Sequence, residues 1–203
     1  MTKRSWVLAA VVVGSMASVA AWSAGNAEQG ATKSTVCAAC HGANGNSVNP
    51  EWPSLAGLGQ DYIVAQLTNF KEGKRANPIM MPNAMALSAD DMADLGAYFS
   101  SQRNTGLEAD PTYWEAGQKL FRAGDKARGI PACMACHGPA GKGNEAAKFP
   151  ALRGQHSVYT IKQLQDYASG ARLTGPNEIM QTISKKLLAD DMRNVASYLQ
   201  GIR

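Results

Sequence analysis

The sequence has little charge, few aromatic side chains and very few histidines. Of its 203 residues, 18% are charged, 7% are aromatic and 45% are hydrophobic, and only three are histidine. A disordered chain would have more charge and fewer apolar residues, and a fibrous or low-complexity protein would repeat short motifs that this sequence lacks. The length suits one medium domain or two small ones of about 100 residues each.

Long hydrophobic runs are missing beyond the first 24 residues. Residues 1–23 combine the basic pair Lys3 and Arg4 with an apolar run and small residues before Ala24, which is typical of an export signal that is cleaved off. Cleavage after Ala20 or Ala24 is an alternative, and so is a retained membrane anchor. The signal predicts a periplasmic protein, in a compartment where disulfides could also form.

Alternating β-branched runs are also missing, so we expect an all-α fold. Residues 61–71 have apolar side chains at helical spacing, and Ser88 with Asp91 forms a capping box for a following helix. Asp110 is expected to cap another helix, with Pro111 in its first position. In each half, three residues are predicted to share the buried face of one helix: Met92, Leu95 and Phe99 in the first half and Met192, Val195 and Leu199 in the second.

The two halves of the chain repeat one another. The segment CAACHG at 37–42 matches CMACHG at 133–138, WPSLAG at 52–57 matches FPALRG at 149–154, and LSADDM at 87–92 matches LLADDM at 187–192. A single duplication of this length indicates two tandem domains rather than a solenoid. We expect a signal peptide at 1–23, domain 1 at 24–103 and domain 2 at 104–203, joined by a polar linker around 102–110.

All four cysteines lie in two C-x-x-C-H strings, at 37–41 and 133–137. This string is the attachment motif of c-type haem: on one helical turn both thiols can reach the two vinyl groups of one porphyrin, and the histidine can reach its iron. Rival interpretations are a zinc site, a thioredoxin-like redox pair and simple disulfides. Two copies at equivalent repeat positions favour two covalent haem c groups, held by Cys37, Cys40 and His41 and by Cys133, Cys136 and His137.

The other axial ligand of each iron decides what the haem can do. Domain 1 has no second histidine, so methionine is the natural candidate, and it would raise the reduction potential and close the iron to substrates. In domain 2 the loop residue Met180 is favoured over Met192. Met180 lies seven residues before Leu187, and the same offset before Leu87 selects Met80, with Met81 as the next candidate. His156 competes for the second haem, although its repeat partner is a glycine.

Further residues around each haem follow from the repeat. The carbonyl groups of Pro53 and Pro150 are expected to accept a hydrogen bond from the axial histidines, which would fix the tautomer of each ring. Side chains that could bind the haem propionates, or could simply pack, are Tyr62, Tyr159, Arg75 and Arg172.

These motifs, together with the two methionine loops, Tyr98 and Tyr198, resemble the dihaem cytochromes of the c4 type over essentially the whole mature chain. The resemblance implies two tandem class I cytochrome c domains, a periplasmic and often membrane-associated protein, and axial ligation by Met80 and Met180. It also implies electron transfer between respiratory complexes, from a quinol-oxidising complex, a small redox carrier or a dehydrogenase, typically towards a terminal oxidase.

Two other functions compete with that of a simple electron carrier. One is the dihaem subunit of a periplasmic dehydrogenase, for instance a flavocytochrome. The other is a dihaem peroxidase, against which the two methionine ligands argue, because an enzyme of that kind needs an open iron site. Neither a nucleic acid nor a small-molecule substrate is expected as a partner.

The charges of the two halves differ in sign. Residues 24–104 hold five basic and seven acidic residues, and residues 105–203 hold 13 basic and nine acidic residues. Scattered charges usually only solvate a surface, but here the sharper hypothesis is that each half steers a different redox partner.

Overall fold

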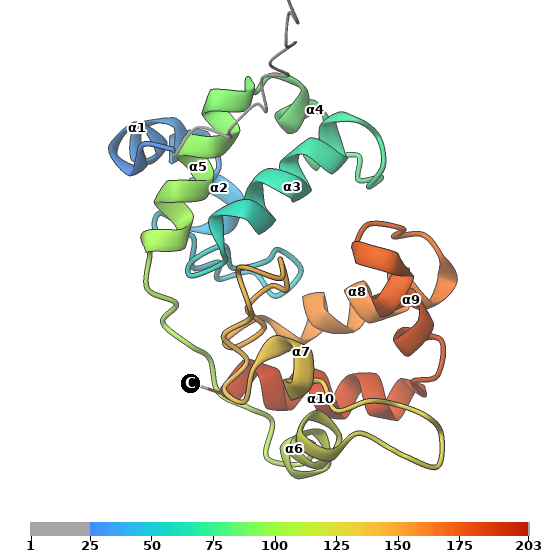
Figure 1. Cartoon of the computed structure of the whole chain (residues 1–203). Helices are drawn as coiled ribbons and strands as arrows, with labels where there is room; N and C mark the ends of the chain where they lie inside the picture. Colours follow the sequence, from blue (N-terminus) through green and yellow to red (C-terminus); the bar gives the residue numbers. More distant parts are fainter. Residues whose placement is uncertain (1–24, 203) are drawn as a thin grey trace, which may run out of the picture.

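The computed structural model describes residues 25–202, and these form two groups of helices joined by an extended connection (Figure 1). The first group contains α1 (Ala27–Lys33), α2 (Ala38–His41), α3 (Gln60–Lys71), α4 (Met80–Met85) and α5 (Ala89–Ser101). The second contains α6 (Trp114–Ala123), α7 (Met134–His137), α8 (Ser157–Ser169), α9 (Ile179–Ser184) and α10 (Ala189–Gly201). Short 3-10 turns precede α2 and α9, at Ser34–Val36 and Pro176–Glu178.

Between residues 25 and 202 the backbone forms isolated β-bridges but no strand, which confirms the all-α prediction. None of the helices described there is long and apolar enough to cross a membrane. The predicted signal peptide at 1–23 lies outside the described residues.

The sequence repeat is also a repeat in space. In each half the first helix crosses the last one, α1 on α5 and α6 on α10, and the last helix also packs against α3 or α8. A glycine lies at each crossing because the backbones approach closely. A Cβ on Gly30 would lie 2.0 Å from the carbonyl oxygen of Asp94, and one on Gly117 would lie 1.9 Å from that of Asn194.

Each half has its own hydrophobic core. In the second half, Phe121 is fully buried and its ring lies 5.4 Å from that of Tyr198. The predicted buried faces are confirmed, since all of these residues are less than 7% exposed: Met92, Leu95, Phe99, Met192, Val195 and Leu199. The two cores explain why the duplicated segments fold as separate domains.

Most predicted helix ends are confirmed, with one correction. Ser88 and Asp91 form the expected capping box at the start of α5, and at α10 the Asp191 carboxylate accepts from the N–H of Leu188, whose own side chain offers no acceptor. The helix predicted to begin at Pro111 begins at Trp114 instead. Asp110 caps the turn that precedes it, accepting from the N–H of Thr112 at 2.8 Å.

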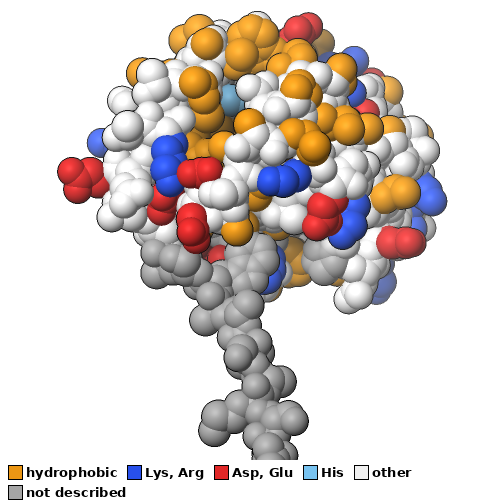
Figure 2. All heavy atoms as spheres, turned by 90° about the horizontal axis from the view of Figure 1, so that it is seen from above, with side chains coloured by type: hydrophobic (Ala, Val, Ile, Leu, Met, Phe, Trp, Pro, Cys, Tyr) orange, Lys and Arg blue, Asp and Glu red, His pale blue; other side chains and the backbone are white. Residues whose placement is uncertain are grey.

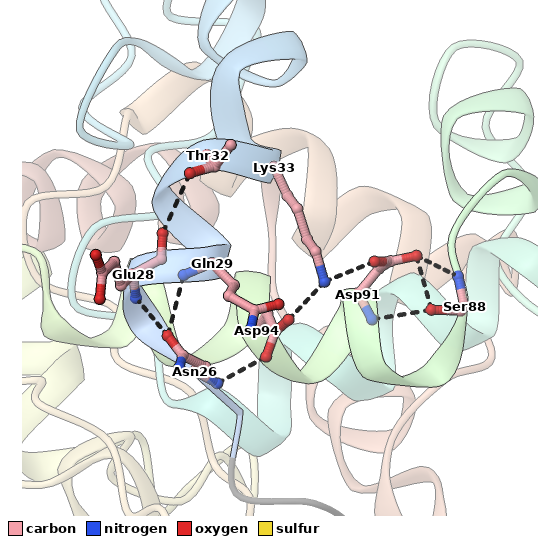
Figure 3. Close-up of polar contacts among 8 residues, drawn as sticks. All are labelled: Asn26, Glu28, Gln29, Thr32, Lys33, Ser88, Asp91 and Asp94. Atoms are coloured by element: carbon pink, nitrogen blue, oxygen red, sulfur yellow. Dashed lines mark hydrogen bonds and ion pairs between the residues drawn. The ribbon is translucent and has the colours of Figure 1, made fainter.

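The first helix is fastened to α5 by charged contacts that Figure 3 shows. The ammonium group of Lys33 lies 2.7 Å from a carboxylate oxygen of Asp91 and 2.5 Å from one of Asp94. Asp94 also accepts from the N–H of Asn26, whose side chain caps α1. In domain 2, Arg128, which follows α6 in the chain, contacts Asp191 of α10 at 2.5 Å.

Candidate functional site

Each C-x-x-C-H string forms one helical turn, as haem attachment requires. In the first, the N–H groups of Cys40 and His41 both donate to the carbonyl oxygen of Cys37, at 3.2 and 2.9 Å. The second turn has the same two hydrogen bonds, at 3.2 and 3.0 Å. None of the four cysteines is in a disulfide, and burial raises the pKa of the Cys37 thiol and that of Cys133, the latter to about 11. The thiols of each pair are therefore free and share one turn.

The two histidines are held in the state that a metal ligand needs. His41 and His137 are each 7% exposed, and their Nδ1 atoms lie 2.8 Å and 2.9 Å from the carbonyl oxygens of Pro53 and Pro150. A carbonyl can only accept, so Nδ1 must carry the proton, which leaves the lone pair of each neutral ring on Nε2. Burial lowers the pKa of both histidines, against the opposing effect of the proline carbonyls. The hydrogen bonds predicted for both prolines are thus present.

The methionine loops match in position and burial. Ala84 and Ser184, four residues after Met80 and Met180, are both completely buried, and both methionines are partly buried. Met180 also packs against the hydrophobic core of domain 2. These observations agree with the offset that selected the two residues, whereas their role as iron ligands is still a prediction, with Met81 as the alternative to Met80.

The two competing ligands, Met192 and His156, have other surroundings. Met192 is 6% exposed and lies in the hydrophobic core of domain 2. The Nε2 atom of His156 lies 2.8 Å from the carbonyl oxygen of Ser47 in domain 1 and therefore donates to it.

Domain 2 also contains buried polar atoms that lack a protein partner. Both amide atoms of Gln181 and the hydroxyl of Ser184 are buried without a hydrogen-bond partner among the described residues. Such atoms are nearly always satisfied in proteins, and Gln181 follows Met180 directly. Their chemistry fits a site that a polar-edged prosthetic group completes.

The four residues predicted near the propionates meet at the boundary between the domains. Arg75 of domain 1 donates to the hydroxyl of Tyr159 at 2.9 Å, and Arg172 of domain 2 donates to that of Tyr62 at 3.0 Å. The backbones of the two arginines also form an antiparallel bridge. Contact with propionates stays a prediction, since these side chains also serve to join the domains.

Two glutamines complete this network, and sequence reasoning used them only as repeat markers. Each accepts from both arginines: Gln66 at 2.9 Å from Arg75 and Arg172, and Gln163 at 2.6 and 2.8 Å. Although burial opposes ionisation, the two guanidinium groups hold the pKa of Tyr62 below its usual value. The sequence did contain a signal for this symmetric contact, because tyrosine, glutamine and arginine have the same spacing in both halves.

The face of the molecule on the side of domain 1 is partly hydrophobic (Figure 2). Seen from above, hydrophobic side chains gather around a hollow in which a histidine side chain is visible (Figure 2). Within residues 25–202, no group of three or more His, Cys, Asp or Glu side chains is arranged to hold a metal ion.

Comparison with known proteins agrees with this geometry. The cytochrome c family model matches residues 27–103 and again 114–203. The chain is 45% identical to cytochrome c4 of Pseudomonas aeruginosa, over 90% of this chain and 91% of that protein. It is 37% identical to a thiosulfate dehydrogenase electron acceptor of Stutzerimonas stutzeri, over 82% of this chain and 78% of that protein.

The fold also matches a solved structure. The crystal structure of reduced recombinant cytochrome c4 from Pseudomonas stutzeri superposes with a TM-score of 0.86 at 43% identity, covering 89% of this chain and all of that one. The prediction of two tandem cytochrome c domains is confirmed, and the two C-x-x-C-H turns fit two covalently bound haem c groups.

Proposed function

This chain belongs to the cytochrome c4 family, and from that premise we propose that it is a periplasmic electron carrier with two methionine-ligated haems. His41 and Met80 would ligate the first iron, and His137 and Met180 the second. The observation that carries the proposal is the doubled arrangement of a C-x-x-C turn beside a neutral histidine whose Nδ1 proton is held by a proline carbonyl.

When bound, each haem supplies an iron that gains and loses one electron. The chain's own residues decide what else that iron can do. The cysteines anchor the ring covalently, and the Pro53 and Pro150 carbonyls keep the Nε2 lone pair of each histidine available. With a histidine and a methionine as its ligands, each iron would have no position left for a substrate. This ligand set supports an electron carrier and argues against a peroxidase.

The domains are held against each other by the arginine network, which favours transfer between the two haems within one molecule. Arg172 is 4% exposed, so its charge is buried among Tyr62, Gln66 and Gln163. Buried guanidinium groups keep fixed positions because their partners must all be satisfied together. Arg75 and Arg172 would in addition bind haem propionates at this boundary.

The redox partners are proposed from the resemblance and from charge. A quinol-oxidising complex, a small carrier or a dehydrogenase would reduce the protein, and a terminal oxidase would oxidise it. The halves differ in charge sign, so donor and acceptor would dock on different domains, with or without peripheral membrane association. Because salt screens the attraction between each domain and a partner of opposite charge, the rate of electron transfer should then fall with both partners as salt rises, and a rate that does not depend on salt for either partner would contradict this assignment.

One relative favours a second function, that of a cytochrome partner of a dehydrogenase. The Stutzerimonas stutzeri relative is named a thiosulfate dehydrogenase electron acceptor. If this chain acts in the same way, it should co-purify with a larger catalytic subunit and accept electrons from it in stoichiometric mixtures. A chain purified alone, and reduced no faster when such a subunit is added, would leave the respiratory carrier as the function.

An optical redox titration of the purified protein tests the main proposal. We expect two haems per chain, both low-spin, with the charge-transfer band of methionine ligation in the ferric state. A high-spin ferric haem, or a missing methionine band, would contradict the proposed ligands and revive the peroxidase.

A further inference from the structure

A glutamine of domain 2 reaches across the domain boundary to the loop that holds the axial histidine of domain 1. Gln155 is 8% exposed, and its side-chain oxygen accepts from the N–H of Ser54 at 2.9 Å. Its amide nitrogen donates to the carbonyl oxygen of Ser54, also at 2.9 Å. Both bonds exist together in only one orientation of the amide, so Gln155 binds the backbone of Ser54 at both polar ends.

The contact matters because of the peptide group to which the N–H of Ser54 belongs. That group is formed with Pro53, and its carbonyl oxygen accepts from Nδ1 of His41 at 2.8 Å. The peptide unit is planar, so fixing its N–H also fixes the direction of its carbonyl. Hydrogen bonds at the two ends of one peptide also strengthen each other by polarisation. Gln155, this peptide and His41 therefore form one hydrogen-bonded chain across the domain boundary.

A second residue of domain 2 anchors the same loop. His156 is 5% exposed and donates from Nε2 to the carbonyl oxygen of Ser47, at 2.8 Å. The N–H of Ser47 in turn donates to the hydroxyl of Ser54 at 3.3 Å. The loop from 47 to 54 is thus held by domain 2 at both of its ends.

The equivalent contact, which domain 1 makes with the proline loop of domain 2, is apolar. In the repeat, Leu58 corresponds to Gln155 and Ala151 to Ser54. Ala151 packs against the hydrophobic cluster of domain 1 that contains Leu58. A leucine side chain can neither donate nor accept, so Leu58 makes no matching hydrogen bond to the Pro150 peptide that orients His137.

We propose that Gln155 is a positioning residue for haem 1, through which domain 2 sets the hydrogen bond, and so the basicity, of the axial His41. The inference rests on the proposed function, in which His41 ligates that iron. A stronger acceptor at Nδ1 makes the imidazole a better electron donor and favours the ferric state. Through this contact the neighbouring domain tunes the axial histidine of haem 1, and Leu58 offers no equivalent hydrogen bond for haem 2.

The test is the substitution Gln155→Leu, which copies the residue that the repeat has at this position. At a fixed potential, the ratio of reduced to oxidised haem 1 should rise by about three- to tenfold, less than the loss of a direct partner of a ligating histidine causes. Haem 2 should not change. In the redox titration, the reduction step that changes in Met80→Ala is assigned to haem 1. Gln155→Met, close in length and volume to glutamine, serves if the leucine variant does not fold.

A second readout is hydrogen exchange of the histidine Nδ1–H protons, measured by NMR in the reduced protein. In Gln155→Leu, exchange at His41 should be faster, and exchange at His137 should not change. The matched control is Glu145→Ala, which removes a different interdomain hydrogen bond, to the N–H of Gln60 at 3.1 Å. This variant should leave exchange at both histidines unchanged.

A haem 1 equilibrium that does not move or moves towards the ferric state, or a haem 2 that moves as much, overturns the proposal. So does equal exchange at His41 in Gln155→Leu and in the wild type. Failure of the proposed function looks different: the wild-type protein itself would then lack two methionine-ligated haems, whatever Gln155 does.

Discussion

The two domains share one framework and differ in the side chains that tune it. The cysteine turn, the histidine–proline hydrogen bond and the glycine crossing occur twice with nearly the same geometry. By contrast, the methionine loop of domain 1 has Met81 and Ala84 where domain 2 has Gln181 and Ser184. Attachment and ligation need a fixed arrangement, whereas a reduction potential responds to any polar atom nearby. Divergence after duplication therefore concerns the properties of the haems rather than their presence.

The largest effect is expected from the axial methionines, and it should be separate for each domain. Met180→Ala should lower the potential of haem 2 by roughly 0.1–0.2 V, within the ~0.8 V range over which axial ligands act. It should also let exogenous imidazole bind there, while haem 1 keeps its spectrum. An optical titration of the variant measures both, and an unchanged haem 2 potential would show that another residue is the ligand.

In domain 1 the same comparison separates two neighbouring methionines. Met80→Ala should abolish the methionine charge-transfer band of haem 1, and Met81→Ala should leave it in place. The reverse result would move the ligand by one residue and break the seven-residue offset shared with Met180.

Replacing the glycine at the helix crossing should destabilise both halves equally. Gly117→Ala and Gly30→Ala each push a Cβ against a backbone carbonyl, so each should lower the free energy of unfolding by about 1–3 kcal/mol. Chemical denaturation measures the loss. Glu115→Ala, on the exposed side of α6, is the control and should cost far less. A large difference between the two glycine variants would mean that only one crossing is tightly packed.

Much of this framework could be predicted from sequence, because the repeat turned weak signals into paired ones. The helix at 61–71, the capping box at Ser88 and the proline hydrogen bonds all follow from local spacing, and each of them is present. The helix predicted at Pro111 was wrong by three residues. Asp110 and Pro111 favour a turn as well as a helix start, and local sequence does not distinguish the two.

Contacts between the domains could not be predicted in the same way. Gly30 lies seven residues before its cysteine and Gly117 sixteen, so the insertion in domain 2 hid their equivalence. The partners of Gln155 and His156 lie more than 100 residues away in the chain. Their pairing depends on how two folded units pack, which no local pattern encodes.

A smaller effect is expected from the helix caps, where the two halves differ by one side chain. Ser88→Ala removes the hydroxyl that accepts from the N–H of Asp91 and should destabilise domain 1 by about 1 kcal/mol. Leu188 is 64% exposed at the equivalent position, so Leu188→Ser should stabilise domain 2 by up to about 1 kcal/mol. Thermal unfolding of both variants measures the pair, and a stabilising Ser88→Ala would contradict it.

The smallest effect concerns the dependence of stability on pH. The two domains should respond alike in acid and differently at alkaline pH. Lys33 holds the pKa of Asp91 and that of Asp94 below their usual range, and Arg128 does the same for Asp191. A depressed carboxyl pKa contributes stability above the unfolded value, about 4, which is lost as the pH falls towards the folded pKa. Both domains should therefore weaken in acid.

At alkaline pH the two ion pairs behave differently. Its hydrogen bonds to Asp91 and Asp94 raise the pKa of Lys33 above 10.5, so this contribution is complete below that value and is lost as the pH rises through the raised pKa. Arg128 stays charged throughout this range. Denaturation midpoints measured up to pH 11 should therefore fall for domain 1 in the wild type but not in Lys33→Arg, with domain 2 unaffected in both. Equal alkaline losses in the two proteins would mean that the contact of Lys33 with α5 contributes no measurable stability.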